Sequence, residues 1–170
     1  MKPFLMGIAT LIFSLTFYLF IHDYNGNKLA NNELRIVCEE ASVAGSLFID
    51  LEKYSEGQIV FDQGQGDAAI RDIIIESLKL DESLSPKANS YWSDPIRYEV
   101  YYFDDSNTTF EPPYRSFKDG LIEEDIEIII KEPQVIVTIN AGKGRYTLPF
   151  LRNLGDNIRS SSHSWSGVGM

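Results

Sequence analysis

The sequence predicts an α+β protein whose N-terminal helix is long and apolar enough to span a membrane. An apolar run without charged side chains opens the chain, two helical patterns follow it, and segments of alternating apolar and polar residues come last. Helices and strands segregated along a chain in this way are typical of α+β folds. We therefore expect a transmembrane helix that continues into a long helix, a second amphipathic helix, and an antiparallel sheet of about four strands packed against them.

The apolar run extends from Phe4 to Ile21 and has eighteen residues, eleven of which are Leu, Ile or Phe. As a helix it is about 27 Å long, close to the thickness of the hydrocarbon core of a bilayer. We assign residues 1–22 to a transmembrane anchor. Because Lys2 and the terminal amine precede the run, we expect the N-terminus in the cytoplasm and the remaining domain on the far side of the cell membrane.

A cleaved secretory signal is the first alternative to a retained anchor. Such signals have an apolar core of about 7 to 15 residues and a small-residue cleavage site. The run here is longer, and the best cleavage position, after Ala30, would place Lys28 where a small residue is needed. The second alternative is a buried helix of a soluble protein. The length of the run favours the retained anchor.

Residues 23–56 are expected to form a helix that continues from the anchor and stops at Gly57. The segment DYNGN has turn chemistry but is short, so anchor and helix are predicted to run nearly collinear from Pro3 to about Tyr54. Apolar residues three and four apart form a narrow seam on this helix: Leu34, Val37, Ala41, Ala44, Phe48 and Leu51.

Small residues in the seam would allow another backbone to approach closely. Ala41 and Gly45 lie one helical turn apart within a run of Ala, Ser and Gly. Two partners are possible: the protein's own sheet, or a helix of another subunit. The sequence leaves both open.

Residues 57–152 are expected to form an extracytoplasmic α+β domain. Asp67 is predicted to cap a second helix over residues 68–80. Alternating patterns predict four strands, and the last two are expected to pair as a hairpin around the turn AGKGR: residues 96–103, 122–131, 134–141 and 145–151. Residues 153–170 are rich in Ser and Gly without a period, and we expect a flexible tail.

The composition argues against several classes of partner. The chain has 15 Lys and Arg against 25 Asp and Glu, a formal net charge of −10. Such a surface repels phosphate backbones and anionic headgroups, so nucleic-acid binding is not expected. The single cysteine, Cys38, excludes an intrachain disulfide. It is read as a buried apolar residue, with an intermolecular disulfide or reactive thiol as the alternative.

No pattern of catalytic or metal-binding residues stands out, so we predict no enzyme activity, no cofactor and no metal. His22 and His163 form no spacing suited to zinc or to a nucleophile and base. Two acidic turns are read as solvated, with a cation site as the alternative: residues 104–107, and Asp62 with Asp67. The charges at residues 123–127 are read as a solvated or edge-protecting face, with carboxylate catalysis as the alternative.

The order of elements resembles the TadE/TadG-like proteins of tight-adherence pilus systems, which are relatives of minor pilins and pseudopilins. The matching stretches are Glu39–Tyr54, Gly66–Asp81 and Gln134–Leu151. The chain departs from a prepilin leader after Gly7, because Ile12 stands where such leaders have Glu. The resemblance implies a pilin-like fold and an assembly function.

We therefore expect a non-enzymatic, membrane-anchored extracytoplasmic protein, a minor pilin-like or pseudopilin-like component of a pilus or secretion assembly. Its partners would be the lipid bilayer and pilin-like or secretion-assembly proteins, with a homo-oligomer possible. The residues predicted to pack against other subunits are Leu34, Val37, Ala41, Ala44, Gly45 and Phe48. The alternative is a single-pass sensor or ligand-binding domain without a fibre partner.

Overall fold

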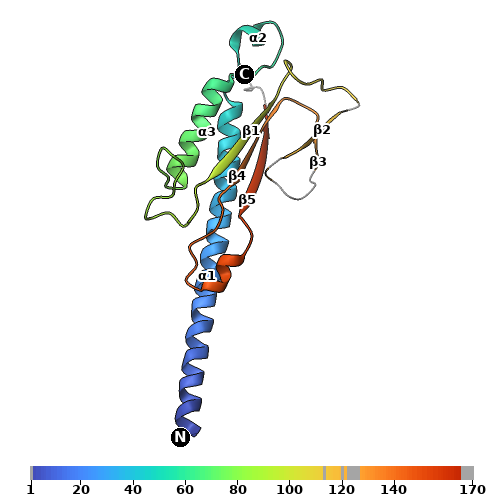
Figure 1. Ribbon diagram of the computed structural model, residues 1–170. Coiled ribbons are helices and arrows are strands. Elements are labelled where there is room, and N and C mark those ends of the chain that lie inside the picture. The colour runs from blue at the N-terminus through green and yellow to red at the C-terminus, as the bar shows by residue number, and fades with distance from the viewer. Residues whose placement is uncertain (1, 113, 120, 122–126, 166–170) are drawn as a thin grey trace.

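A computed structural model describes residues 2–112, 114–119, 121 and 127–165, and it confirms an α+β fold that begins with one long helix. Helix α1 extends from Lys2 to Ser46 (Figure 1). Its 45 residues correspond to about 67 Å. The helix passes through DYNGN without a break, as the expected collinearity requires. It ends eight residues before Tyr54, because the chain turns at Leu47 and Phe48.

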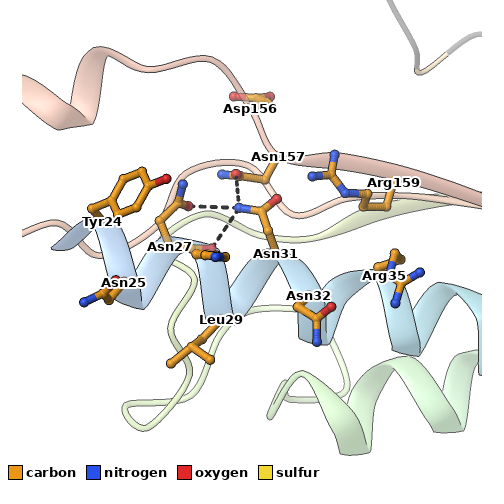
Figure 2. Close-up of a pocket in the computed structure, with 11 residues that line it drawn as sticks. Tyr24, Asn25, Asn27, Leu29, Asn31, Asn32, Arg35, Asp156, Asn157 and Arg159 are labelled. Atoms are coloured by element: carbon orange, nitrogen blue, oxygen red, sulfur yellow. Dashed lines mark hydrogen bonds between the residues drawn. The ribbon is translucent and has the colours of Figure 1, made fainter. Parts of the chain in front are cut away.

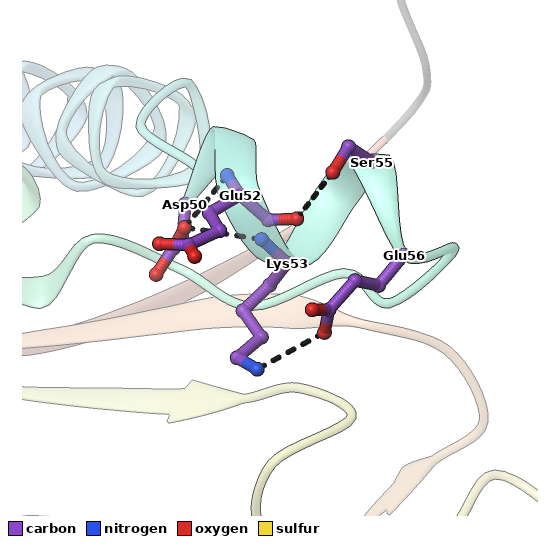
Figure 3. A network of polar contacts seen from close by, with 5 residues as sticks. All are labelled: Asp50, Glu52, Lys53, Ser55 and Glu56. Atoms are coloured by element: carbon purple, nitrogen blue, oxygen red, sulfur yellow. Dashed lines mark hydrogen bonds and ion pairs between the residues drawn. The ribbon is translucent and has the colours of Figure 1, made fainter.

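A short helix, α2 (Leu51–Ser55), completes the segment predicted as one helix. The Asp50 carboxylate caps it by accepting hydrogen bonds from the backbone N–H groups of Glu52 and Lys53, at 2.9 and 3.2 Å (Figure 3). The Lys53 ammonium lies 3.0 Å from the Glu56 carboxylate. Gly57 follows with φ +83°, a backbone conformation that favours glycine and stops the helix where the sequence predicted.

Helix α3 (Gln63–Ser77) begins five residues before the predicted start. Its cap is Asp62, which accepts a hydrogen bond from Gln65 N at 3.1 Å. The predicted cap, Asp67, lies inside the helix and accepts a hydrogen bond from the Tyr102 hydroxyl at 2.8 Å. The sequence was misleading because Gly64 and Gly66 resemble a turn. Gly66 lies where α3 packs against α1, with its added Cβ position 3.2 Å from the Gly45 carbonyl oxygen.

In the described part of the chain, three strands form the main antiparallel sheet, in the order β1-β4-β5. These are β1 (Arg97–Phe103), β4 (Gln134–Asn140) and β5 (Ile158–Ser164). The predicted strands at 96–103 and 134–141 are confirmed. The predicted flexible tail is wrong over residues 158–164, which pair along the whole of β4. Residues 166–170 lie outside the described residues.

The predicted fourth strand and its hairpin are also wrong. Residues 145–151 form no strand, and the 3-10 helix η1 (Pro149–Asn153) ends the segment. Pro149 lacks a backbone N–H and cannot donate to a ladder. A second sheet pairs β2 (Arg115–Lys118) with β3 (Glu127–Ile130). Residues 122–126 of the strand predicted at 122–131 lie outside the described residues.

The main sheet is covered on both faces. All seven residues of β4 are buried. Val135, Val137 and Ile139 belong to the core shared with α1 and α3, whereas Ile136 packs with Phe103 under the β2–β3 hairpin. Figure 1 shows the two helices on one side of the sheet and the hairpin on the other. This alternation of β4 follows the sequence prediction.

The N-terminal part of α1 projects from the domain (Figure 1). Its most apolar window of 18 residues has a mean hydropathy of 2.2, and none of these residues is buried in protein. Among the described residues, α1 is the one helix long and apolar enough to cross a membrane. This is consistent with a membrane anchor.

Candidate interaction site

Helix α1 carries five of the six residues predicted to pack against other subunits, and the sixth, Phe48, lies two residues beyond the end of the helix. Leu34 and Ala41 are fully buried, Val37 is 2% exposed, Gly45 is buried, and Ala44 and Phe48 are half-buried. They pack against α3, β4 and β5 of the same chain. The structure thus selects the first alternative, docking onto the protein's own sheet. For Leu34, Val37, Ala41 and Gly45, the prediction of an inter-subunit surface is corrected, because these buried residues offer no contact to a second subunit.

The small residues of the seam permit the close approach that the sequence predicted. A Cβ atom added at Gly45 would lie 2.7 Å from Ile70 Cδ1 and 3.2 Å from Val135 Cγ1. On α3, a Cβ atom at Gly66 would lie 3.2 Å from the carbonyl oxygen of Gly45 and 2.5 Å from the Tyr102 hydroxyl. The backbone that comes close is therefore that of α3.

Cys38 lies in the same interior. Its side chain is fully buried, and its thiol donates a hydrogen bond to the carbonyl oxygen of Val137 at 2.9 Å. Burial raises the pKa of Cys38 to about 12. The prediction that Cys38 is a buried residue is therefore confirmed. A reactive thiol is not supported, because the raised pKa keeps the sulfur protonated.

Closer to the membrane, a polar residue fixes α1 to the domain. The Asp23 carboxylate is buried and accepts a hydrogen bond from Leu148 N at 2.8 Å. Desolvation alone would raise the pKa of Asp23, but hydrogen bonds from Leu148 and Thr147 outweigh it and hold the pKa below 3.8. The charged form is thus favoured in the folded protein.

Two asparagines continue this contact at successive turns of α1. The Asn27 amide oxygen accepts a hydrogen bond from the Tyr146 hydroxyl at 3.1 Å. The Asn31 amide nitrogen donates to Asn157 Oδ1 at 2.8 Å (Figure 2). We call Asp23, Asn27 and Asn31 the polar ladder. The sequence analysis missed it, although the spacing of four residues on one helical face was a visible signal.

An open groove of about 1030 Å³ lies between this part of α1 and the start of β5 (Figure 2). Three cationic side chains line it: Lys28, Arg35 and Arg159. Asparagine amides and Asp156 add hydrogen-bonding groups. In a chain with a net charge of −10, this is a local concentration of positive charge.

The outer face of α1 carries exposed apolar residues. Leu29 is 72% exposed, Ile36 41% and Val43 38%. At about 100° per residue, all three lie within about 40° of one another around the helix axis. We call these three residues the outer stripe. It points away from the protein's own sheet, in contrast to the buried seam.

Charged residues border the outer stripe with opposite signs. Glu33 and Glu40 lie seven residues apart along one edge, and Lys28 and Arg35 lie seven residues apart toward the other. All four are exposed. Arg35 also lies 3.3 Å from Glu39, so the basic edge includes one acidic side chain.

The acidic turns considered as cation sites have structural partners. Asp104 is fully buried and accepts a hydrogen bond from Phe61 N at 3.1 Å, and Asp105 accepts one from Ile59 N at 2.6 Å. These bonds tie the segment before α3 to the end of β1. Within the described residues, no group of three or more His, Cys, Asp or Glu side chains converges on a point that could hold a metal ion.

The candidate carboxylates at 123–125 lie outside the described residues, and Glu127 begins β3. His22 lies 3.8 Å from the Asp23 carboxylate, whereas His163 is on β5, so the structure does not bring the two histidines together into one described site. Comparison with protein-family models, curated proteins and solved structures found no match.

Proposed function

We propose that the protein is a membrane-anchored extracytoplasmic subunit of a pilus or secretion assembly, similar to minor pilins and pseudopilins, that acts by contact with other subunits. The N-terminal part of α1 lies in the bilayer, with the N-terminus in the cytoplasm and the α+β domain on the far side. Continuity of α1 supports a retained anchor, because cleavage after Ala30 would remove the buried Asp23 and its contact with Leu148.

The main observation behind this proposal is the outer stripe, an exposed apolar face of α1. It continues the apolar surface of the membrane segment along the part of α1 that packs on the sheet, so one helix presents apolar side chains both in and beyond the bilayer. An apolar face that its own domain leaves uncovered is typical of an interaction surface. We assign a second copy of this chain as its partner.

The charges beside the stripe support parallel, side-by-side packing of copies. Copies anchored in one membrane have the same orientation, so the acidic edge of one α1 can face the basic edge of the next. When the two outer stripes face each other across a twofold axis, the acidic edge of each copy faces the basic edge of its partner, so the contact is isologous and pairs two copies. Exposed ion pairs of this kind contribute little affinity, but they select orientation.

Disulfide crosslinking in native membranes tests the proposal. Ile36→Cys and Val43→Cys should give dimers on oxidation, since these residues would face their counterparts. Ile129→Cys is the matched control, because Ile129 is 55% exposed but lies on β3. The native Cys38 is buried and should not crosslink. Monomers alone at both stripe positions would contradict the proposal.

Charge reversal provides a second test of the same contact. Glu40→Lys should reduce the dimer yield of Val43→Cys by placing like charges at the contact. Adding Arg35→Glu should restore the yield, because the two edges then match again with exchanged signs. Equal yields in all three backgrounds would show that the charged edges do not face each other.

A membrane-anchored sensor or ligand-binding domain is the second candidate, and the groove beside α1 favours it. Lys28, Arg35 and Arg159 would suit a small anionic ligand. Thermal unfolding of the full chain in detergent, with phosphate and with dicarboxylates, tests this candidate. A stabilisation by one of these anions that Arg159→Gln removes would support it, and unchanged unfolding temperatures would count against it.

A further inference from the structure

The segment around η1 lies at the level where the apolar run of α1 ends. Leu148, directly before η1, donates its backbone N–H to Asp23 at 2.8 Å. Asp23 is two residues beyond Ile21, the last residue of the run, which is about 3 Å along the helix. Figure 1 shows η1 beside α1 at the end of the domain from which the N-terminal part of the helix projects.

Large apolar side chains are exposed on this segment. Phe150 is 58% exposed and Leu154 is 48% exposed, and they are four residues apart. Arg152, between them, is also exposed and donates a hydrogen bond to the Tyr146 carbonyl oxygen at 3.5 Å. Tyr24, on α1 at the same level, is 59% exposed. Aromatic residues are enriched at this depth of membrane proteins, and arginine side chains reach lipid phosphates from it.

We propose that Phe150 and Leu154 insert into the surface of the bilayer that α1 spans, so that η1 is a second membrane contact of the domain. The proposal rests on the membrane anchoring given under the proposed function. The headgroup region on each side of a bilayer is roughly 5 to 7 Å thick, so a segment about 3 Å beyond the apolar run lies within it.

The geometry favours lipid over a protein partner for this segment. The polar ladder holds the 146–157 segment against α1, so η1 cannot leave the level of Asp23 without breaking these hydrogen bonds. If α1 spans a bilayer, η1 therefore lies at the depth of the lipid surface. Because the contact is apolar and the chain is acidic, it does not depend on anionic lipid.

Fluorescence quenching of the full chain in phosphatidylcholine vesicles tests this contact. Phe150→Cys and Leu154→Cys are each labelled with the environment-sensitive dye NBD. The expected result is blue-shifted emission that is lost when the vesicles contain phospholipid with a nitroxide near the headgroup. Leu51→Cys is the control, because Leu51 is 75% exposed on α2, at the opposite end of the domain (Figure 1). Its emission should not respond to nitroxide lipid.

The use of two labelled positions protects the test against a local effect of either substitution, and the unmodified chain should take up no dye because Cys38 is buried. Emission from both positions that aqueous iodide quenches and nitroxide lipid does not would overturn the proposal. Blue-shifted emission that depends on protein concentration and not on nitroxide lipid would assign the segment to a second copy and would also overturn it.

Extraction of the vesicles with alkaline carbonate separates this proposal from the anchor. A chain that stays in the membrane while both dyes respond only to iodide has an anchor but no contact at η1. A chain that carbonate removes has no spanning helix, and the proposed function itself then fails.

Discussion

The close crossing of α1 and α3 predicts opposite effects of one substitution at two glycines of the same helix. Gly64 and Gly66 both lie near the start of α3. A Cβ atom at Gly64 would find its nearest neighbour, Asp62 Oδ1, at 3.5 Å, an ordinary contact. A Cβ atom at Gly66 would lie 3.2 Å from the Gly45 carbonyl oxygen on α1 and 2.5 Å from the Tyr102 hydroxyl on β1. The helix accepts alanine at both positions, but the crossing accepts it only at Gly64.

The magnitude follows from two terms. Replacing glycine by alanine in a helix raises the free energy of unfolding by up to about 1 kcal/mol. Both variants gain this term, so it largely cancels when their stabilities are compared. Overpacking at a tight contact costs about 1 to 3 kcal/mol, and only Gly66→Ala incurs it. Gly64→Ala should therefore be neutral or slightly more stable than the parent, and Gly66→Ala should be less stable than Gly64→Ala by about 1 to 3 kcal/mol.

Urea unfolding of the full chain in detergent micelles measures this difference. Trp92 is 2% exposed and supplies a fluorescence signal from the core. With a urea slope of about 1 to 3 kcal/mol/M, the two midpoints should differ by on the order of 1 M. Equal midpoints for Gly64→Ala and Gly66→Ala would refute the tight packing of Gly66 against α1 and Tyr102.

A double-mutant cycle identifies the atom responsible. Tyr102→Phe removes the hydroxyl that a Cβ atom at Gly66 would meet, although it also loses the hydrogen bond to Asp67. The destabilisation caused by Gly66→Ala should therefore be smaller in the Tyr102→Phe background than in the parent. An unchanged effect would indicate that the backbone of α1, and not the hydroxyl, sets the limit.

Three further predictions concern single sites. Asp23→Asn should cost about 2 kcal/mol and speed hydrogen exchange at the Leu148 amide by roughly 30-fold, because a bond to a charged acceptor is weakened. Burial would raise the pKa of Asp23, but hydrogen bonds hold the pKa below its ordinary value. The stabilisation by the charged form is therefore full above about pH 5 and is lost as the pH falls through the lower folded value. Urea midpoints measured from pH 5 to 2 should fall less for Asp23→Asn than for the parent. Gly142→Ala should destabilise by about 1 to 2 kcal/mol in thermal unfolding, because Gly142 has φ +63° and a Cβ atom would lie 2.8 Å from Asp94 Cβ. Cys38 should react with maleimide only under denaturing conditions, and fast labelling of the folded chain would contradict its burial.

Local periodicity was sufficient to predict the helices and two strands of the main sheet. The spacing of three and four marked the buried face of α1, and alternation marked the two faces of β1 and β4. These patterns involve residues that are close together in the chain, so they can be recognised from the sequence alone. They do not show what covers an apolar face, which is why the buried seam was also a candidate for subunit contact.

Nonlocal pairing accounts for the errors. Strand β5 has the sequence IRSSSHS, with one apolar residue, and it becomes a strand because β4 pairs with it along seven residues. Its small serines also allow α1 to lie close, with Ser161 Oγ 3.5 Å from Ser42 Oγ. By contrast, residues 145–151 are more apolar and form no strand. Because residues 145–151 are more apolar than residues 158–164, they were predicted to pair with β4, whereas β5 is the strand that does so.

The polar ladder was missed for a related reason. Asp23 and Asn27 flank the turn-like YNG, and their partners Leu148 and Tyr146 lie 125 and 119 residues further along the chain. The segment has turn chemistry, but a nearly collinear helix was predicted because the segment is short, and hydrogen bonds to the distant segment support the helix there. The spacing of four residues on α1 was visible in the sequence, but partners more than 100 residues away could not be identified from it.

Helix α1 is continuous, so its N-terminal apolar part and the part that packs on the sheet are expected to tilt together. Without a hinge between its apolar part and the part bound to the sheet, any tilt of the first is a tilt of the second. Membrane-crossing helices tilt by about 20° on average, and over about 67 Å this swings the far end sideways by about 23 Å. Bilayer thickness, which governs tilt, would thus set how far the distal tip around α2 leans from the membrane normal.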